Sequence, residues 1–202
     1  MFDALSLFSL IVLFFSIMLH EIAHGSVALQ LGDPTAKNAG RLTLDPTKHI
    51  DLFGTIILPL TLLFITNGRG PIFGWAKPVP INPFNFRDQK WGALKVSVAG
   101  PSMNFLVAVI FSLSIRFLTL PDNFLTLFSI IAVYNFAWGI FNLIPIPPLD
   151  GSHIIFSFFP KSWNQIRFFL ERFGTFILIL FIFLGLQWVF ILAEKLFYLV
   201  VV

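Results

Sequence analysis

The sequence of 202 residues contains no cysteine and few charged side chains. Without cysteine the chain forms neither disulfides nor thiolate metal sites, and it has no cysteine nucleophile. Only 11% of the residues are charged, whereas soluble domains carry roughly 25%. The 13 Lys and Arg residues are scattered, which excludes the contiguous basic face of a nucleic-acid-binding protein. This scarcity of charge is typical of a protein whose main solvent is the lipid bilayer.

Hydrophobic residues make up 57% of the chain, and the mean hydropathy is +0.88. A helix needs about 20 apolar residues to cross a bilayer. The apolar runs cover residues 4–31, 52–66, 92–118, 125–143 and 173–192. We therefore expect an all-α polytopic membrane protein with about four to five transmembrane helices.

We expect one integral membrane domain over residues 1–202, with its core at about 4–160 and a C-terminal transmembrane helix at about 173–192. The amino terminus lacks the basic region of a cleaved signal, so the first run is interpreted as a retained helix.

The run 52–66 is shorter than the others and has Pro59 near its middle. Such a run favours a re-entrant segment or a short, tilted one over a full crossing. The loop that follows, 67–90, cannot be a helix because it contains Pro71, Pro78, Pro80 and Pro83. Within it, 75–81 is predicted to be an edge strand or an extended membrane-associated segment.

The motif His20-Glu21-x-x-His24 places three ionisable side chains inside the first apolar run. Each of them is costly at membrane depth unless it has a partner. On a helix, His20 and His24 lie one turn apart on one face, where both imidazoles can reach one metal ion. Glu21 lies on the adjoining flank and suits a base acting on metal-bound water. The pattern predicts a catalytic zinc site with Glu21 as its base.

A catalytic zinc has three protein ligands, so one remains to be found. The extended zincin motif would need Gly and His where this chain has Val27 and Gln30, which excludes that subclass. A glutamate ligand is disfavoured because the other two glutamates, Glu171 and Glu194, lie near the carboxyl end. The remaining candidates are Asp33, Asp45, His49, Asp51, Asp88, Asp122, Asp150 and His153.

Asp150 is the favoured third ligand. It follows an apolar run and a backbone interrupted by Pro145, Pro147 and Pro148. Freed carbonyl groups at membrane depth are tolerated only where they line a cavity or are packed in protein, and a carboxylate there calls for a cation. His153, and more distantly His49, stay open as alternatives.

Two asparagines in the apolar runs are candidate substrate-binding residues, because their amides can hydrogen-bond a substrate carbonyl or a developing oxyanion. Asn142 begins the segment that leads to Asp150, and Asn104 interrupts the third run. The nearby Gly100 and Pro101 are interpreted as a helix kink with small residues for close packing.

These motifs together resemble the site-2 proteases, a family of intramembrane zinc metalloproteases, and in particular their compact bacterial branch without a PDZ domain. His20-Glu21-x-x-His24 is similar to the family's metal motif, and Asn142-x-x-Pro145-x-x-x-x-Asp150-Gly151 to its second motif. Further similarity lies at residues 40–44, 49–51, 74–80 and 99–104.

The resemblance implies that His20, His24 and Asp150 bind one zinc ion, that Glu21 acts as general base and acid, and that Asn142 helps to hold the substrate. The expected partners are a membrane-protein or transmembrane-peptide substrate and the lipid bilayer. The expected location is the cytoplasmic membrane of a bacterium, as a multi-pass protein. The segment 75–81 resembles a membrane-associated strand that pairs with an unwound substrate.

Two other functions use the same residues. A metal transporter or metal sensor would hold the ion without hydrolysis, but a conducting path needs ionisable residues through the membrane depth. An inactive scaffold is disfavoured because Glu21 is present.

The sequence also constrains the topology. His20 and His24 lie late in the first run, and Asp150 follows the fourth. If they share a metal, the first and fourth runs must point the same way. We therefore expect 52–66 not to cross fully, or the proline-rich loop to dip back.

Overall fold

The computed structural model describes residues 4–66 and 74–202. Four helices are long and apolar enough to span a membrane: α1 (Ala4–Gln30), α4 (Gly92–Phe117), α5 (Asp122–Asn142) and α7 (Asn164–Val201). The shorter elements are α2 (Thr35–Asn38), η1 (Pro46–Lys48), η2 (Leu52–Ile57), α3 (Leu58–Ile65), η3 (Pro83–Asn85), α6 (Asp150–Phe156) and η4 (Lys161–Trp163). The described residues contain no strand. The expectation of an all-α polytopic protein is confirmed.

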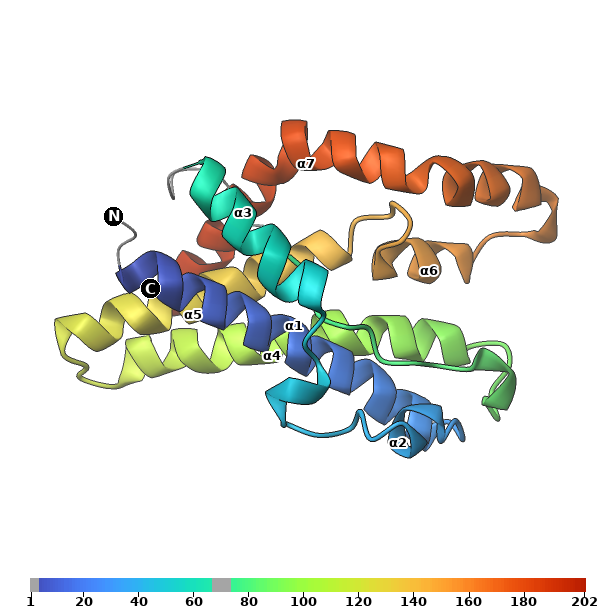
Figure 1. Ribbon diagram of the computed structural model, residues 1–202, viewed down its shortest axis with the longest axis horizontal. Coiled ribbons are helices and arrows are strands. Elements are labelled where there is room, and N and C mark those ends of the chain that lie inside the picture. Colours follow the sequence, from blue (N-terminus) through green and yellow to red (C-terminus); the bar gives the residue numbers. More distant parts are fainter. Residues whose placement is uncertain (1–3, 67–73) are drawn as a thin grey trace.

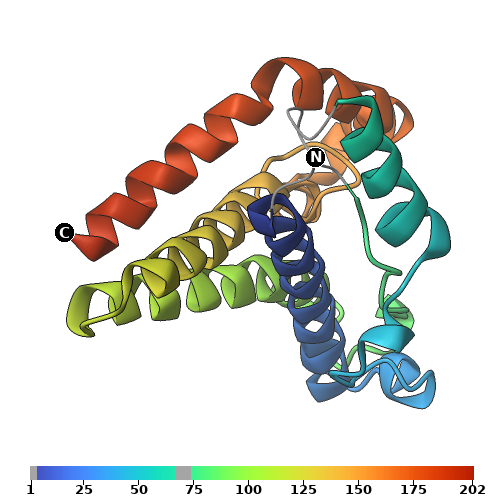
Figure 2. The same ribbon diagram turned by 60° about the vertical axis from the view of Figure 1, so that its left-hand side comes forward.

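Helices α4 and α5 form an antiparallel hairpin against which α1 and α7 pack (Figure 1). Small side chains at Ala108, Ala132 and Ala137 are buried where these helices meet, beside Phe136. Small residues let helix backbones approach closely within a bilayer. In Figure 2, α1 stands between α3 on one side and the α4–α5 hairpin on the other, and α7 passes above them. The helix α7 is longer than the span expected at about 173–192.

The chain returns to the carboxyl end of α1 before α4 begins, since the Arg87 amide donates to the Leu31 carbonyl over 2.8 Å. In between, η2 and α3 cover Leu52–Ile65, about 21 Å of helix at 1.5 Å per residue, which is short of the ~30 Å hydrocarbon core. The Trp75 amide then donates to the Gly54 carbonyl at 3.1 Å.

The second run is therefore an excursion that comes back to its starting side, and α1 and α5 run in the same direction (Figure 1). Asn67 and Pro71 of the predicted loop lie outside the described residues.

Asp33 ties the end of α1 to the segment that precedes α4. Its side chain is fully buried. The carboxylate accepts hydrogen bonds from the Asn82 amide at 2.7 Å and from Asn85 Nδ2 at 2.8 Å, as well as from Thr35. Asp33, a candidate metal ligand in the sequence, thus serves as a local anchor for the loops beside the site.

The segment 74–82 is extended, as predicted. Hydrogen bonds along one of its edges attach it to the loop that follows α1. The Lys77 amide donates to the His49 carbonyl at 2.9 Å. Arg41, which is buried, donates to the carbonyl groups of Lys77 and Pro78. These contacts hold the segment beside α1 without a second strand.

Candidate metal centre

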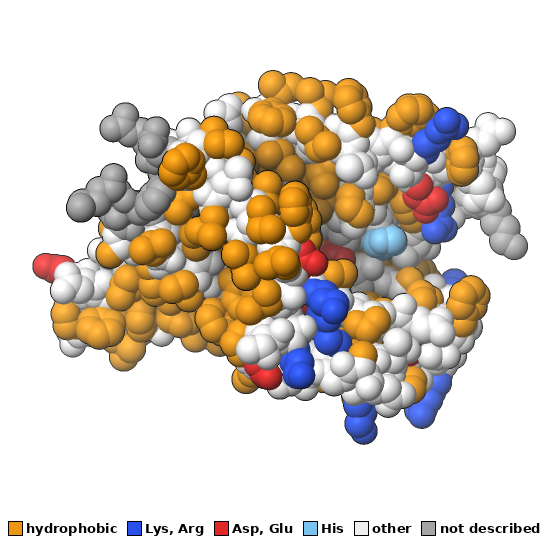
Figure 3. Space-filling model, viewed as in Figure 1, with side chains coloured by type: hydrophobic (Ala, Val, Ile, Leu, Met, Phe, Trp, Pro, Cys, Tyr) orange, Lys and Arg blue, Asp and Glu red, His pale blue; other side chains and the backbone are white. Residues whose placement is uncertain are grey.

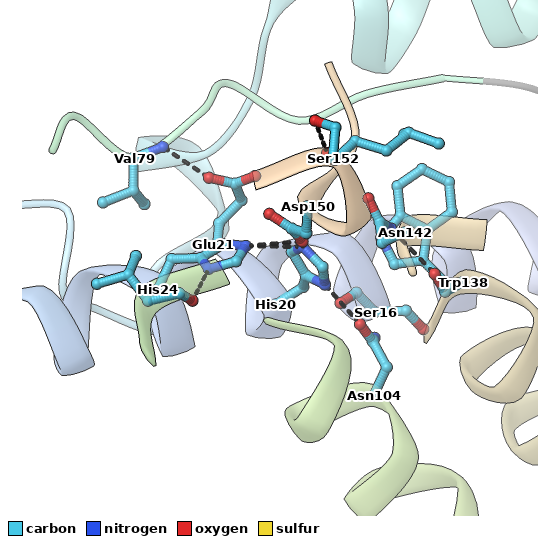
Figure 4. A network of polar contacts seen from close by, with 12 residues as sticks. Ser16, His20, Glu21, His24, Val79, Asn104, Trp138, Asn142, Asp150 and Ser152 are labelled. Atoms are coloured by element: carbon cyan, nitrogen blue, oxygen red, sulfur yellow. Dashed lines mark hydrogen bonds and ion pairs between the residues drawn. The ribbon is translucent and has the colours of Figure 1, made fainter. Parts of the chain in front are cut away.

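The helix α1 presents both motif histidines to Asp150 (Figure 4). His20 Nε2 and His24 Nε2 lie 2.9 Å apart, and they are 3.0 and 3.2 Å from Asp150 Oδ2. Ligand atoms bound about 2.0–2.1 Å from a tetrahedral zinc are about 3.3 Å apart. The three atoms therefore form a triangle of the size that one zinc ion requires, and both histidines are buried.

The second nitrogen of each histidine fixes the tautomer. His24 Nδ1 lies 2.7 Å from the Val96 carbonyl oxygen, which only accepts, so Nδ1 must carry the proton. His20 Nδ1 lies 2.7 Å from Asn104 Oδ1 and donates to it in the same way. Metal binding requires the neutral imidazole, in which a proton on Nδ1 leaves Nε2 unprotonated, and both Nε2 atoms face Asp150, as in metal-binding histidines with such outer partners.

The donor set fits a zinc ion. Asp150 Oδ2 is buried and has no hydrogen-bond donor, while the two nitrogens facing it offer only lone pairs. Three acceptors held together this closely need a cation between them. Two nitrogens and one carboxylate oxygen are ligands that zinc prefers, with a fourth position left for water.

Gly100 leaves room beside the histidine nitrogens. A Cβ at this position would lie 2.4 Å from His24 Nε2 and 2.5 Å from His20 Nε2. The interpretation of Gly100 as a residue for helix packing is therefore incomplete, because its missing side chain opens space at the metal centre itself.

Asp150 reaches the site because the chain folds back after α5. Residues 143–149 form an irregular segment that ends where α6 begins at Asp150. Gly151 permits this fold-back, since a Cβ there would lie 2.2 Å from the Leu143 carbonyl oxygen. The Ser152 hydroxyl donates to the Leu149 carbonyl at 2.7 Å and holds the first turn of α6.

Glu21 lies beside the triangle and is oriented by the extended segment. Its Oε2 accepts a hydrogen bond from the Val79 amide at 2.7 Å. A cavity of about 390 Å³ brings Glu21 together with His20, His24 and Asp150, and its walls also include Asn142, Pro148, His153 and apolar side chains. The arrangement places a carboxylate base, three ligands and space for a peptide in one cavity.

The two predicted substrate-binding asparagines occupy different places. Asn142 lines the cavity, and its amide donates to the Trp138 carbonyl at 2.9 Å. Asn104 is fully buried behind His20. Its Nδ2 donates to the Ser16 carbonyl at 3.1 Å and to Asn135 Oδ1 at 3.0 Å. This geometry favours a role for Asn104 in holding His20, in place of the substrate contact expected from the sequence.

The other candidate ligands do not join the described cluster of His20, His24 and Asp150. His153 lines the cavity, whereas His49 is buried against the Thr43 carbonyl at 2.9 Å. Three of the remaining acids cap turns or pair with a lysine: Asp45 with the Thr47 amide, Asp51 with the Gly54 amide, and Asp88 with Lys95. Asp122 is exposed in the first turn of α5.

Three contributors to the site are absent from the sequence prediction. Asn135 could have been predicted from the sequence, because an amide side chain in the middle of an apolar run needs a hydrogen-bond partner. Arg41 lies in one of the resembling segments without an assigned role. The Val96 carbonyl has no sequence signal, since every residue carries such a group.

Comparison with known proteins agrees with this chemistry. The model of peptidase family M50 matches residues 118–185. A Bacillus subtilis (strain 168) protein named "Putative zinc metalloprotease YwhC" is 37% identical over 185 residues, covering 85% of this chain and 78% of its own. "Zinc metalloprotease MJ0392" of Methanocaldococcus jannaschii is 26% identical over 78% of this chain and 36% of its own length.

"Putative zinc metalloprotease Rip2" of Mycobacterium tuberculosis is 30% identical over 67% of this chain. The match covers 51% of the length of that relative. No solved structure gives a significant match to the chain. The similarity to the Bacillus protein extends over most of both chains. The chain therefore belongs to peptidase family M50, the site-2 proteases, and is a multi-pass zinc metalloprotease.

Proposed function

We propose that this metalloprotease hydrolyses a peptide bond within or near a transmembrane segment of its substrate. The observation that carries the proposal is the position of the metal centre inside a spanning helix. His20, Glu21 and His24 lie within Ala4–Gln30, a helix long and apolar enough to cross the membrane. A scissile bond must reach that depth to be cut.

In the proposed site, His20, His24 and Asp150 hold the zinc ion, and Asn104 and the Val96 carbonyl orient the two imidazoles. When bound, zinc polarises the scissile carbonyl and lowers the pKa of water at its open position. The tautomers of His20 and His24 keep Nε2 free for this role.

Glu21 is the proposed general base and acid. One carboxylate oxygen, Oε2, accepts the Val79 amide hydrogen, which leaves Oε1 to take a proton from the attacking water. Glu21 then passes this proton to the amine that leaves. General acid–base catalysis by a positioned side chain contributes typically 10²–10⁴-fold to the rate.

The extended segment and Asn142 are the proposed substrate contacts. A transmembrane helix hides its peptide groups in its own hydrogen bonds, so it must unwind before water attacks. One edge of the extended segment is already bonded to the protein, so an unwound substrate strand can pair only with the other edge. Pro78 and Pro80 have no N–H, so they can take part in that pairing only as acceptors. The Asn142 amide, on another wall of the cavity, supplies a further polar contact.

A metal transporter is less consistent with the distribution of charge. In the described spans, the Asp, Glu, Lys and Arg side chains other than Glu21 lie toward the helix ends: Lys95, Arg116, Asp122, Arg167, Glu171, Arg172, Glu194 and Lys195. A conduction path would need such groups across the membrane depth.

The test is the exchange Glu21→Gln in the full chain. We expect zinc content to stay at the wild-type level and cleavage of a membrane-embedded reporter to fall at least 10²-fold, because the amide takes no proton. Glu171→Gln is the matched control, since Glu171 is an exposed residue of α7 paired with Arg167, and it should cleave normally. Full activity of Glu21→Gln, or metal flux into liposomes without any cleavage, would refute the proposal.

A further inference from the structure

We propose that Asn135 is a positioning residue of the metal centre: it fixes the orientation of the Asn104 amide and thereby the tautomer of His20. The inference rests on the proposed role of His20 as a zinc ligand and does not depend on the substrate. Asn135 lies on α5, makes no contact with the ligand atoms, and is almost completely buried at 2% exposure.

The hydrogen bonds in this chain of side chains have one direction. Asn135 Nδ2 donates to the Ile131 carbonyl at 2.9 Å. Since a carbonyl only accepts, Asn135 must turn its oxygen toward Asn104. That oxygen accepts from Asn104 Nδ2 at 3.0 Å, and the Ser16 carbonyl accepts from the same nitrogen at 3.1 Å. The Ser16 carbonyl and Asn135 Oδ1 therefore both require that Nδ2 of Asn104, and not Oδ1, points toward them.

The consequence appears at the histidine. With its nitrogen held by Ser16 and Asn135, Asn104 presents Oδ1 to His20 Nδ1 at 2.7 Å. The imidazole must then carry its proton on Nδ1, and Nε2 stays free for the metal. If the amide turned over, its NH₂ group would face Nδ1 and favour the tautomer with a proton on Nε2, which cannot bind zinc.

Asn135 also connects the metal centre to α5, the helix that leads to Asn142 and Asp150. Asn104 of α4 lies against His20 and Ser16 of α1 (Figure 4). Because its Nδ2 also donates to Asn135 of α5, three spanning helices meet at one amide. Buried amides without partners are costly, and all polar atoms of Asn104 are used within this network.

The test compares Asn135→Leu with Ser112→Ala in the full chain. Ser112 is a fully buried residue of α4 whose hydroxyl bonds only to the Ala108 carbonyl of its own helix. Losing a direct outer partner of a metal ligand weakens metal binding about 10–100-fold. Since Asn135 acts through the outer partner Asn104, we expect Asn135→Leu to weaken zinc binding by up to about that factor. We expect Ser112→Ala to bind zinc like the wild type. Equal zinc affinity of Asn135→Leu and the wild type would overturn the inference.

A second comparison separates orientation from packing. In Asn104→Asp both terminal atoms are oxygens, so either can accept from His20 Nδ1 and no orientation needs to be fixed. Adding Asn135→Leu to Asn104→Asp should then cause no further loss of zinc affinity. The same loss in both backgrounds would assign the effect of Asn135 to packing and refute the orientation role.

A spectroscopic readout tests the tautomer directly. Nitrogen-15 spectra of the zinc-free protein should show His20 protonated on Nδ1 in the wild type and partly on Nε2 in Asn135→Leu. An unchanged tautomer would count against the inference. His20→Ala is included as a separate check: if it binds zinc like the wild type, the ligand role of His20 fails, whereas a loss of binding leaves the result for Asn135 interpretable.

Discussion

Among single residues, Gly100 determines how much space exists at the metal centre. Its Cα faces the two Nε2 atoms, and the position that a Cβ would take lies 2.4 and 2.5 Å from them. Glu21 is fixed in a comparable way by one backbone amide, that of Val79. Both features depend on backbone that passes close to α1, so neither follows from the motif His20-Glu21-x-x-His24 alone.

We predict that Gly100→Ala separates folding from metal binding. Alanine favours a helix over glycine by up to about 1 kcal/mol, so the zinc-free variant should contain normal helix. Its methyl group, however, must displace the imidazoles, and zinc affinity should fall at least 10-fold. Metal titration and circular dichroism measure the two effects.

The matched control is Gly139→Ala, whose Cβ would have the Phe105 ring as its nearest neighbour at 3.1 Å, and which should bind zinc normally. Wild-type zinc affinity in Gly100→Ala would show that the space beside the nitrogens is not needed.

At the level of elements, the loops beside the site are held by buried charges. Arg41 binds the carbonyl groups of the extended segment, and Asp33 binds the amides that precede α4. Burial by itself would raise the pKa of Asp33, but the hydrogen bonds from Thr35, Asn82 and Asn85 outweigh it and lower this pKa below the ordinary value. The ionised form is therefore the one that the fold stabilises.

This lowered pKa predicts a pH dependence. The stabilisation by Asp33 is present above its unfolded-state pKa of about 3.9 and is lost as the pH falls through the lower folded-state pKa. Asp33→Asn should reduce stability at neutral pH by about 1.5–3 kcal/mol, the contribution of hydrogen bonds to a charged group.

The difference in thermal unfolding midpoint between wild type and Asp33→Asn should stay constant near neutral pH and shrink below about pH 4. Asp122→Asn, at the exposed start of α5, is the control and should change the midpoint little. A difference that grows on acidification would contradict the sign of this argument.

For the whole molecule, the basic side chains gather toward the end that carries the loops beside the site, while apolar surface dominates the other end (Figure 3). This end includes Lys37, Arg41, Lys48, Lys77, Arg87 and Lys90. Short loops rich in Lys and Arg stay on the cytoplasmic side of a membrane. The active-site end is therefore expected to face the cytoplasm, with the α4–α5 turn on the opposite side.

Because the chain has no cysteine, single cysteines test this topology without background. We predict that Lys37→Cys and Lys90→Cys react with a membrane-impermeant maleimide only after cells are opened, and that Thr119→Cys reacts in intact cells. All three positions are exposed. Labelling of positions 37 and 90 from opposite sides would mean that residues 52–66 cross the membrane fully, against the return of the chain described above.

The spanning helices, the one-turn spacing of the paired histidines and the position of Asp150 beside them were predictable from the sequence. Hydrophobic length and helical spacing are local properties, and with so few acids each could be weighed in turn. The extended character of 74–82 was predictable for the same reason, since Pro78 and Pro80 exclude a helix wherever they occur.

Only the tertiary structure decided which groups lie behind the ligands. The partners of His24 and His20 are 72 and 84 residues away in the chain, and their contacts depend on how α4 is rotated against α1. The same packing placed Asn104 behind His20 instead of in the cavity, and it put Asn135 next to it. Hydrogen bonds between distant helices depend on packing geometry, which hydropathy and spacing within one helix do not specify.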